Sequence, residues 1–219
     1  MTDAEYCESL VREADKDRFL ATLFAPADRR ADLYVVYAFD LETAAVAQRV
    51  RDPVAGEIRL QWWYDALTQE GNEAGHPVAE ALLEATVERG IDGTLPLLVI
   101  DARRRDLYTD RDQTEAEFEL VASESAGSIF RMASEALAGP ADEATRLACH
   151  HAGVAALAKD EALALKHREA VRALVPSLPE AALPALLPLT LMIENRTGLA
   201  QWRKQWVLWR ASKNLAKWL

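Results

Sequence analysis

The stretch Asp28-Arg29-Arg30-Ala31-Asp32-Leu33-Tyr34-Val35-Val36-Tyr37-Ala38-Phe39 decides the fold class. From Asp28 to about Arg51, apolar side chains recur every three or four residues, which gathers them on one face of a helix. Pro53 ends the pattern, since proline removes a helical hydrogen bond. The same period continues through every long segment, and the weak strand-like run at 97–100 lies inside a helical window. The sequence therefore predicts an all-α protein.

Capping signals mark where several of the other helices begin. Thr2 with Glu5 and Thr114 with Glu117 have the spacing of capping boxes, and the helix after Thr114 is expected to run to Leu137. Further helices are predicted around residues 58–66, from the His76-Pro77 pair, and over 95–108, 141–174 (with a break near Gly153 as the alternative), 176–191 and 199–219. No repeat or linker divides residues 1–219, so we expect a single domain.

Composition excludes several classes of protein. The 219 residues carry a net charge of −10, which disfavours nucleic acid as a partner because phosphate binding needs a basic surface. The two cysteines, Cys7 and Cys149, lie far apart and form no disulfide framework, which is typical of a reducing cytosol. The acidic N-terminus resembles neither a signal peptide nor a transit peptide, and no apolar run reaches the roughly 18 residues of a membrane span. We expect a cytoplasmic protein.

Four segments, in order, resemble the squalene/phytoene synthase superfamily, and together they cover roughly residues 10–155. The opening stretch resembles the R-x-x-x-x-x-Y-A-F entry to the family's first catalytic helix. The other three segments are Ile58-Arg59-Leu60-Gln61-Trp62-Trp63 with Leu67 and His76-Pro77-Val78, then Ile100-Asp101 with Asp106-Leu107, then Ser125-Ala126-Gly127-Ser128 with Met132. The resemblance implies a helical bundle of the isoprenoid synthase type around a deep cavity.

Enzymes of this family join two prenyl diphosphates head to head, and Asp-rich motifs on two facing helices hold the Mg²⁺ that clamps diphosphate. Where the first motif belongs, this sequence has Ala44, Ala45 and Gln48. Asp40 and Glu42 are two residues apart, so they point about 160° away from one another on a helix and cannot share a metal ion. The resemblance therefore implies that no metal or other cofactor is bound, with Mg²⁺ required only if the protein is an enzyme.

The second acidic motif should follow Gly153-Val154-Ala155. Instead, the chain soon reaches His167-Arg168-Glu169-Ala170, which resembles a later helix of the family. We therefore predict a bundle shortened by loss of a helix and loop after about residue 155.

Other acidic and histidine pairs are interpreted as structural. Asp28 with Asp32 is expected in a solvated first turn of a helix, and Asp106 with Asp110 in a charged exit turn. Arg103, Arg104 and Arg105 are expected to pair with Asp101 and Asp106. His150 and His151 are adjacent, so they face about 100° apart on a helix and predict no zinc site. The candidates for lining a remnant cavity are Tyr37, Asp40, Arg51, Arg59, Asp101 and Asp106.

The last predicted helix has a composition of its own. Trp202, Trp206 and Trp209 form one stripe, and the last 19 residues carry a charge of +5 while the first 200 carry −15. The stripe is interpreted either as the packing face of the helix or as a surface that docks on an anionic membrane or a membrane-bound client. The docking candidates are Trp202, Arg203, Trp206, Trp209, Arg210 and Lys213.

The functional prediction follows from the resemblance and from the lost acidic motifs. The superfamily includes a catalytically inactive branch, the phytoene-synthase-like assembly factor of respiratory complex I and its bacterial relatives. We predict an inactive bacterial protein of this kind, an assembly or scaffold factor that is cytoplasmic and peripheral to the inner membrane. Its partner would be the membrane surface or a membrane-complex client, and not nucleic acid. Two alternatives stay open: a prenyltransferase with displaced acidic residues, and a carrier that holds an isoprenoid or quinone without chemistry.

Overall fold

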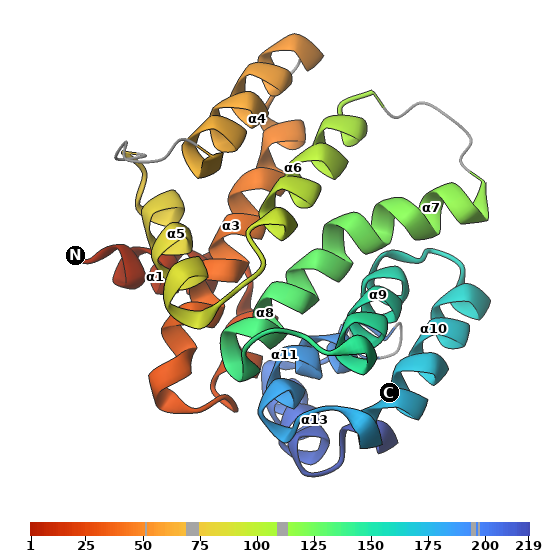
Figure 1. The fold of residues 1–219 in the computed structure, drawn as a ribbon. Coiled ribbons are helices and arrows are strands. Elements are labelled where there is room, and N and C mark those ends of the chain that lie inside the picture. The colour runs from red at the N-terminus through yellow and green to blue at the C-terminus, as the bar shows by residue number, and fades with distance from the viewer. Residues whose placement is uncertain (51, 69–74, 109–113, 194–195, 197) are drawn as a thin grey trace.

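Helix α3 (Arg30–Arg49) carries the opening sequence stretch, and its side chains from Asp32 to Asp40 are all buried. In this computed structural model, which describes residues 1–219 except 51, 69–74, 109–113, 194–195 and 197, α3 passes between helices on several sides (Figure 1). The described residues form helices and turns without a strand, so the all-α prediction is confirmed. Burial all round α3 explains why its residues between 33 and 39 are almost continuously apolar.

The N-terminal half surrounds α3 with five further helices. Helices α1 and α5 pack on α3, and α4 packs against α6. Both capping boxes are confirmed, since Glu5 N–H donates to Thr2 Oγ1 and Thr2 N–H donates to Glu5 in return. The bounds are α1 (Asp3–Ala14), α2 (Lys16–Thr22), α4 (Pro53–Thr68), α5 (Pro77–Arg89) and α6 (Thr94–Asp106), with a 3₁₀ turn, η1 (Ala27–Arg29), before α3.

The helix predicted to run from Thr114 to Leu137 has the expected ends but contains a π-helical turn. It consists of α7 (Glu115–Ala122), the π turn η2 (Ser123–Gly127) and α8 (Ser128–Ala138), which form one continuous rod in green in Figure 1. The Ser125 hydroxyl donates to the carbonyl of Val121 at 2.7 Å within this turn. Propensity does not distinguish a π turn from an α-helix, so the sequence did not reveal it.

The prediction of one long helix over residues 141–174 is wrong, and so is the alternative break near Gly153. The structure has α9 (Glu143–Leu157) and α10 (Glu161–Leu174), separated by Ala158–Asp160. Asp160 begins α10 because its carboxylate accepts a hydrogen bond from Leu163 N–H at 2.8 Å. The short connection folds the two helices against one another as a hairpin, on the right of Figure 1.

The C-terminal region is a series of short turns and one longer helix. The proline-spaced segment after α10 forms η3 (Val175–Ser177), η4 (Glu180–Ala182), α11 (Leu183–Leu186) and η5 (Leu187–Leu191). The final helix, α13 (Gln201–Lys213), is shorter than predicted and is followed by η6 (Leu215–Lys217). Asn214 ends α13 because its side chain accepts from Lys217 N–H at 3.2 Å and starts a new turn.

Two groups of buried apolar residues hold these elements together, and α8 contributes to both. The first lies between α1, α3, α5 and α6, and the second between α9, α10, η5 and α13. Ala133 and Ala136 of α8 belong to the first, and Phe130 belongs to the second. Helix α8 therefore couples the two halves of the chain.

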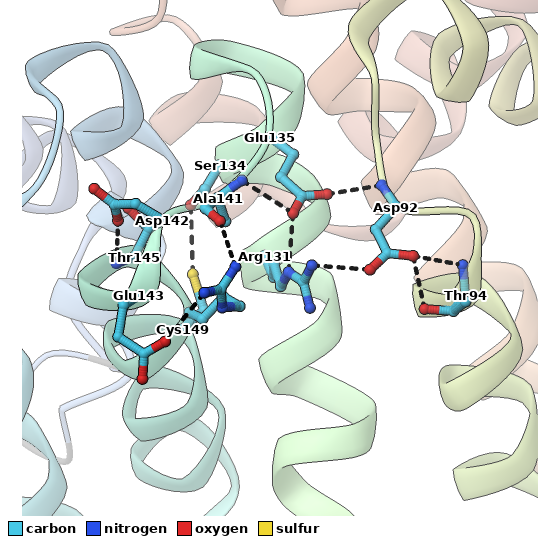
Figure 2. A network of polar contacts seen from close by, with 11 residues as sticks. Asp92, Thr94, Arg131, Ser134, Glu135, Ala141, Asp142, Glu143, Thr145 and Cys149 are labelled. Carbon is cyan, nitrogen blue, oxygen red and sulfur yellow. Dashed lines mark hydrogen bonds and ion pairs between the residues drawn. The ribbon is translucent and has the colours of Figure 1, made fainter.

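A buried carboxylate anchors two loops to the end of α8. Glu135, 1% exposed, accepts hydrogen bonds from Asp92 N–H at 2.8 Å, from Arg131 Nε at 2.9 Å and from Ala141 N–H at 3.3 Å. Figure 2 shows Arg131 reaching in the other direction to Asp92. The loops before α6 and before α9 are thus both held by one side chain, which the sequence did not single out.

A close helix crossing lies between η2 and α9. A Cβ atom placed on Gly153 would be 2.3 Å from Gly127 N and 2.8 Å from the carbonyl oxygen of Ala122. All of these are backbone atoms, which cannot move aside as a flexible side chain does. The two glycines therefore allow α9 to approach the π turn at backbone contact.

We predict that Gly153→Ala lowers the free energy of unfolding by about 2–3 kcal/mol, because α9 must move away from η2 and the buried contacts around it are lost. Gly93→Ala is the matched control, since its nearest neighbour would be a methyl group at 3.8 Å. Urea denaturation of both variants measures the difference. Equal stability of the two variants would show that the crossing does not constrain α9.

Candidate functional site

Asp40 lies at the centre of a buried ion cluster built from three helices. Its Oδ2 atom is 2.6 Å from Arg18 Nη1 of α2, and its Oδ1 atom is 2.7 Å from Arg103 Nη2 of α6. All three side chains are between 10% and 16% exposed. The Arg18 guanidinium also stacks over the ring of Tyr37, 5.2 Å from its centroid. The structure therefore brings Tyr37 and Asp40 together, and adds Arg18, which sequence reasoning missed.

The charge state of this cluster follows from its neighbours. Burial alone raises the pKa of the Asp40 carboxyl, but the charges and hydrogen bonds of Arg18 and Arg103 outweigh it, so the pKa lies below its usual value. Burial also raises the pKa of the Tyr37 phenol, which stays protonated. Asp40 is consequently an anion whose two oxygens are both occupied by cations.

Of the remaining cavity candidates, Asp106 joins the cluster and Asp101 does not. Arg103 Nη1 lies 3.4 Å from Asp106 Oδ2, so one guanidinium bridges Asp40 and Asp106. Asp101 is exposed and pairs with Arg104 at 2.9 Å. The predicted pairing with Asp101 and Asp106 is confirmed for Arg103 and Arg104, whereas Arg105 forms an ion pair with Glu124. The additional bond from Arg103 to Asp40 was not predicted.

Arg59 lies elsewhere, and Arg51 falls outside the described residues. Arg59 is exposed and lines a separate surface pocket of about 290 Å³ between α3 and α4. The rest of the lining is Glu42, Val46, Arg49, Trp62, Trp63 and His76. Arg59 and Asp101 therefore lie apart from the Asp40 cluster, and the prediction of a remnant cavity stays a prediction. Residues that the family resemblance grouped together lie on different faces of the protein once the helices are packed.

The residues present do not fit the Mg²⁺ of the family's enzymes. On α3 the expected positions hold Ala44, Ala45 and Gln48, which offer no carboxylate. The two acids that remain have different partners, since Asp40 binds Arg18 and Arg103 whereas Glu42 lies 3.6 Å from Arg49. Mg²⁺ prefers carboxylate oxygens and water in near-octahedral geometry. We therefore derive no chemical step through this metal.

The acidic pairs that the sequence analysis interpreted as structural match that expectation only in part. Asp28 is exposed, as predicted for a solvated turn. Asp32 is 8% exposed and is bound by Arg89 Nε at 2.8 Å, so the prediction of a solvated side chain is wrong for this residue. Although it lies in the first turn of α3, Asp32 faces Arg89 of α5, which its sequence position did not indicate. Asp110 lies outside the described residues.

The tryptophan stripe of α13 faces away from the protein. Trp202, Trp206 and Trp209 are 66%, 50% and 49% exposed, whereas Val207 and Leu208 of the same helix are buried. The packing interpretation of the stripe is therefore wrong. Arginines lie over two of the rings, Arg203 over Trp202 at 5.1 Å and Arg210 over Trp206 at 5.4 Å. The exposed face of α13 is thus both aromatic and basic. Among the described helices, none has the length and apolar content needed to span a bilayer.

A group of three imidazoles lies at the α9–α10 hairpin. His150 and His151 of α9 meet His167 of α10, and the Nδ1 atoms of His151 and His167 are 3.0 Å apart. Burial, followed by the neighbouring imidazoles, lowers the pKa of His151 to about 4. The prediction of no metal site considered only His150 and His151, which lie on the same helix. It missed His167, which is 16 residues further along the chain.

Comparison with known proteins places this fold in a family. The sequence profile of squalene/phytoene synthases matches residues 11–158. The chain belongs to this family. The match ends at the close of α9, so α10, the turns after it and α13 lie outside the matched region. The predicted loss of a helix and loop after residue 155 stays a prediction.

Curated relatives are proteins named NADH dehydrogenase (ubiquinone) complex I, assembly factor 6. The mouse protein is 28% identical over 60% of this chain, and the human protein is 27% identical over the same share. A fruit fly homologue is 26% identical over 47% of the chain. This chain spans about 40% of the length of the two mammalian relatives.

Solved structures with the same fold are synthases. A crystal structure of a dehydrosqualene synthase in complex with ligand has a TM-score of 0.82 at 17% identity, covering 98% of this chain and 97% of that one. Squalene synthase from Alicyclobacillus acidocaldarius has a TM-score of 0.58 at 17% identity, covering 98% and 92%. At this identity the likeness establishes the isoprenoid synthase type of fold.

We predict that Asp40→Asn lowers the free energy of unfolding by about 3 kcal/mol, because it leaves two largely buried guanidinium groups without their counter-charge. Asp101→Asn is the control, since it removes an exposed ion pair worth about 1 kcal/mol or less. Denaturant unfolding at neutral pH measures both. Similar losses in the two variants would contradict a central role for Asp40.

The pH dependence of this loss provides a separate prediction. The folded pKa of Asp40 lies below the unfolded value of about 3.9, so its contribution is present above that value and is lost as the pH falls through the folded pKa. The difference in unfolding free energy between wild type and Asp40→Asn should therefore shrink as the pH drops below about 4. A difference that stays constant down to pH 2 or so would show that Asp40 is not the titrating group.

Proposed function

We propose that this protein is an assembly or scaffold factor for a membrane respiratory complex, complex I, and that it does not transfer prenyl groups. The relatives named complex I assembly factor 6 support the role, and the state of Asp40 supports the lack of chemistry. The Asp40 carboxylate is paired with two arginines, whose positive charge disfavours a metal ion at its oxygens. The observation that carries the proposal is the ion cluster of Asp40, Arg18 and Arg103. Asp40 lies about one turn before the positions on α3 where the family's acidic motif belongs.

The face of α13 supports attachment to an anionic membrane surface. Exposed tryptophans suit the interface between lipid headgroups and acyl chains, and the basic residues of the last 19 positions suit anionic lipid. The body of the protein carries −15 and is repelled by the same surface, so we infer that it attaches through α13 with the body held away. Attachment would be peripheral and on the cytoplasmic side of a bacterial inner membrane.

One observation favours the carrier alternative. A groove of about 850 Å³ lies beside the end of α13, where Phe24, Leu183 and Leu187 contribute apolar side chains. Lys213 and Asn214 lie at the same groove and provide polar groups. An isoprenoid tail with a polar head matches this combination.

We predict no prenyltransferase activity. Incubation with farnesyl or geranylgeranyl diphosphate and Mg²⁺ should yield no head-to-head product, because the carboxylates that hold the metal are absent from α3. An active family synthase assayed in parallel controls for the reagents. Sustained product formation that requires Mg²⁺ would overturn the proposal, and binding of the diphosphate without Mg²⁺ would favour a carrier.

We predict that the protein floats with phosphatidylglycerol vesicles and not with phosphatidylcholine vesicles. Exchanging Arg203 and Lys213 for glutamine should weaken binding by up to about 30-fold, since each basic residue near an anionic surface contributes about 1 kcal/mol. Trp202→Ala should also weaken it, through lost interfacial contact.

Lys159→Gln combined with Arg172→Gln is the matched control, since both residues are exposed cations outside α13. It removes the same charge and should leave flotation nearly unchanged. Equal loss in both double variants would mean that net charge, rather than α13, determines binding. No flotation of the wild-type chain would leave a protein client as the only partner of α13.

A further inference from the structure

The three imidazoles at the α9–α10 hairpin converge on one point. His150, His151 and His167 each offer a ring nitrogen, and these three atoms all lie within 4.8 Å of one another. The ring centroids of His151 are 5.0 Å from those of both other histidines. Histidines of two helices meet here only because the turn at Ala158–Asp160 reverses the chain.

The surroundings fix how two of the rings are oriented. His167 is 2% exposed, and its Nε2 atom lies 3.1 Å from Glu119 Oε1 of α7. In the neutral tautomer whose Nε2–H donates to this carboxylate, the Nδ1 lone pair is directed at His151. Ser123 of the π turn contacts His150 Nδ1 at 2.8 Å. A carboxylate behind a histidine is the usual outer partner of a metal-binding imidazole, since it sets the tautomer.

The spacing suits a tetrahedral ion. With metal–nitrogen bonds of about 2.0–2.1 Å, two ligand nitrogens on a tetrahedral zinc ion lie roughly 3.4 Å apart. The Nδ1 atoms of His151 and His167 are already at 3.0 Å, and small rotations of the partly exposed rings of His150 and His151 cover the rest. In the absence of an ion, His151 must donate a proton to His167 across this gap, and an ion would replace that proton.

The protonation of the three imidazoles also favours the binding of a metal ion. Three adjacent imidazoles cannot readily be protonated together, and burial lowers the pKa of both His150 and His151. Neutral imidazoles have free lone pairs at physiological pH, which is the form that binds transition metals. A carboxylate at Glu119 partly balances the positive charge of an ion.

We propose that His150, His151 and His167 bind one divalent transition-metal ion of the zinc class, with Glu119 positioning His167. Three neutral nitrogen donors suit zinc and its neighbours, and do not suit Mg²⁺ or Ca²⁺, which take oxygen ligands. The fourth position is left to water or an external ligand. The ion would bind α9 to α10, and through Glu119 to α7.

The test uses Co²⁺ as a probe on the full chain, because tetrahedral Co²⁺ absorbs visible light strongly and is displaced by Zn²⁺. We expect one equivalent of Co²⁺ to give this spectrum and one equivalent of Zn²⁺ to remove it. Zinc should also raise the melting temperature by roughly 5 °C at a hundredfold excess over its dissociation constant.

Each histidine variant has a matched control in this chain. His150→Gln and His151→Gln replace partly exposed ligands and should abolish the spectrum and the zinc-dependent rise in melting temperature. His76→Gln changes the fourth histidine of the sequence, which caps α5 far from the hairpin, and should leave both unchanged. Glu119→Gln should weaken zinc binding about 10- to 100-fold while the stoichiometry stays at one.

The proposal fails if the wild-type chain shows no tetrahedral Co²⁺ spectrum. It also fails if His151→Gln and His76→Gln bind the ion equally well, since binding would then lie elsewhere. Circular dichroism of each variant confirms that it is folded, and the His150→Gln and His151→Gln pair keeps the test independent of the buried His167.

Discussion

The pairing of Asp40 with Arg18 and Arg103 is the interaction on which much of this structure depends. Moving three charges out of water is costly, and their mutual attraction offsets that cost only when the geometry is good. The two contacts of 2.6 and 2.7 Å meet this condition, and they connect α2, α3 and α6 through one carboxylate. A change in how any of these helices packs would leave a buried charge without a partner. The cluster therefore limits the ways in which the N-terminal half can fold.

The same cluster involves Asp40, which lies just before the positions on α3 where the family's first acidic motif belongs. Both oxygens of Asp40 accept hydrogen bonds from guanidinium groups, and the two positive charges beside them disfavour a metal ion at the same carboxylate. The charged groups of this cluster connect three helices. Fold and function are separable in this way because the packing of a bundle depends on apolar volume, and activity depends on a few polar groups.

In the C-terminal half, the position of a helix does not by itself determine which of its faces is exposed. Helix α13 buries Val207 and Leu208 and is tied to α2 by Lys204, whose Nζ atom lies 2.6 Å from Asp17. Its tryptophans remain outside. At the other end of this half, Gly127 and Gly153 let α9 approach η2 closely, which brings His150 next to Ser123. Small residues at one crossing thereby determine which side chains meet a turn away.

The amino-acid sequence by itself determined the all-α class, both capping boxes, most helix starts and the family, because these depend on local spacing and on motifs that lie close together in the chain. It also showed that Ala44, Ala45 and Gln48 offer no carboxylate where the family's first acidic motif belongs. Only the tertiary structure decided which face of α13 is exposed, that Arg18 reaches Asp40 across 22 residues, and that His167 joins His150 and His151. The physical reason is that a stripe of large aromatic residues has the same helical period whether it is buried or exposed. Likewise, contacts between helices depend on turns such as Ala158–Asp160, whose geometry is set by a few hydrogen bonds that leave little trace in residue spacing.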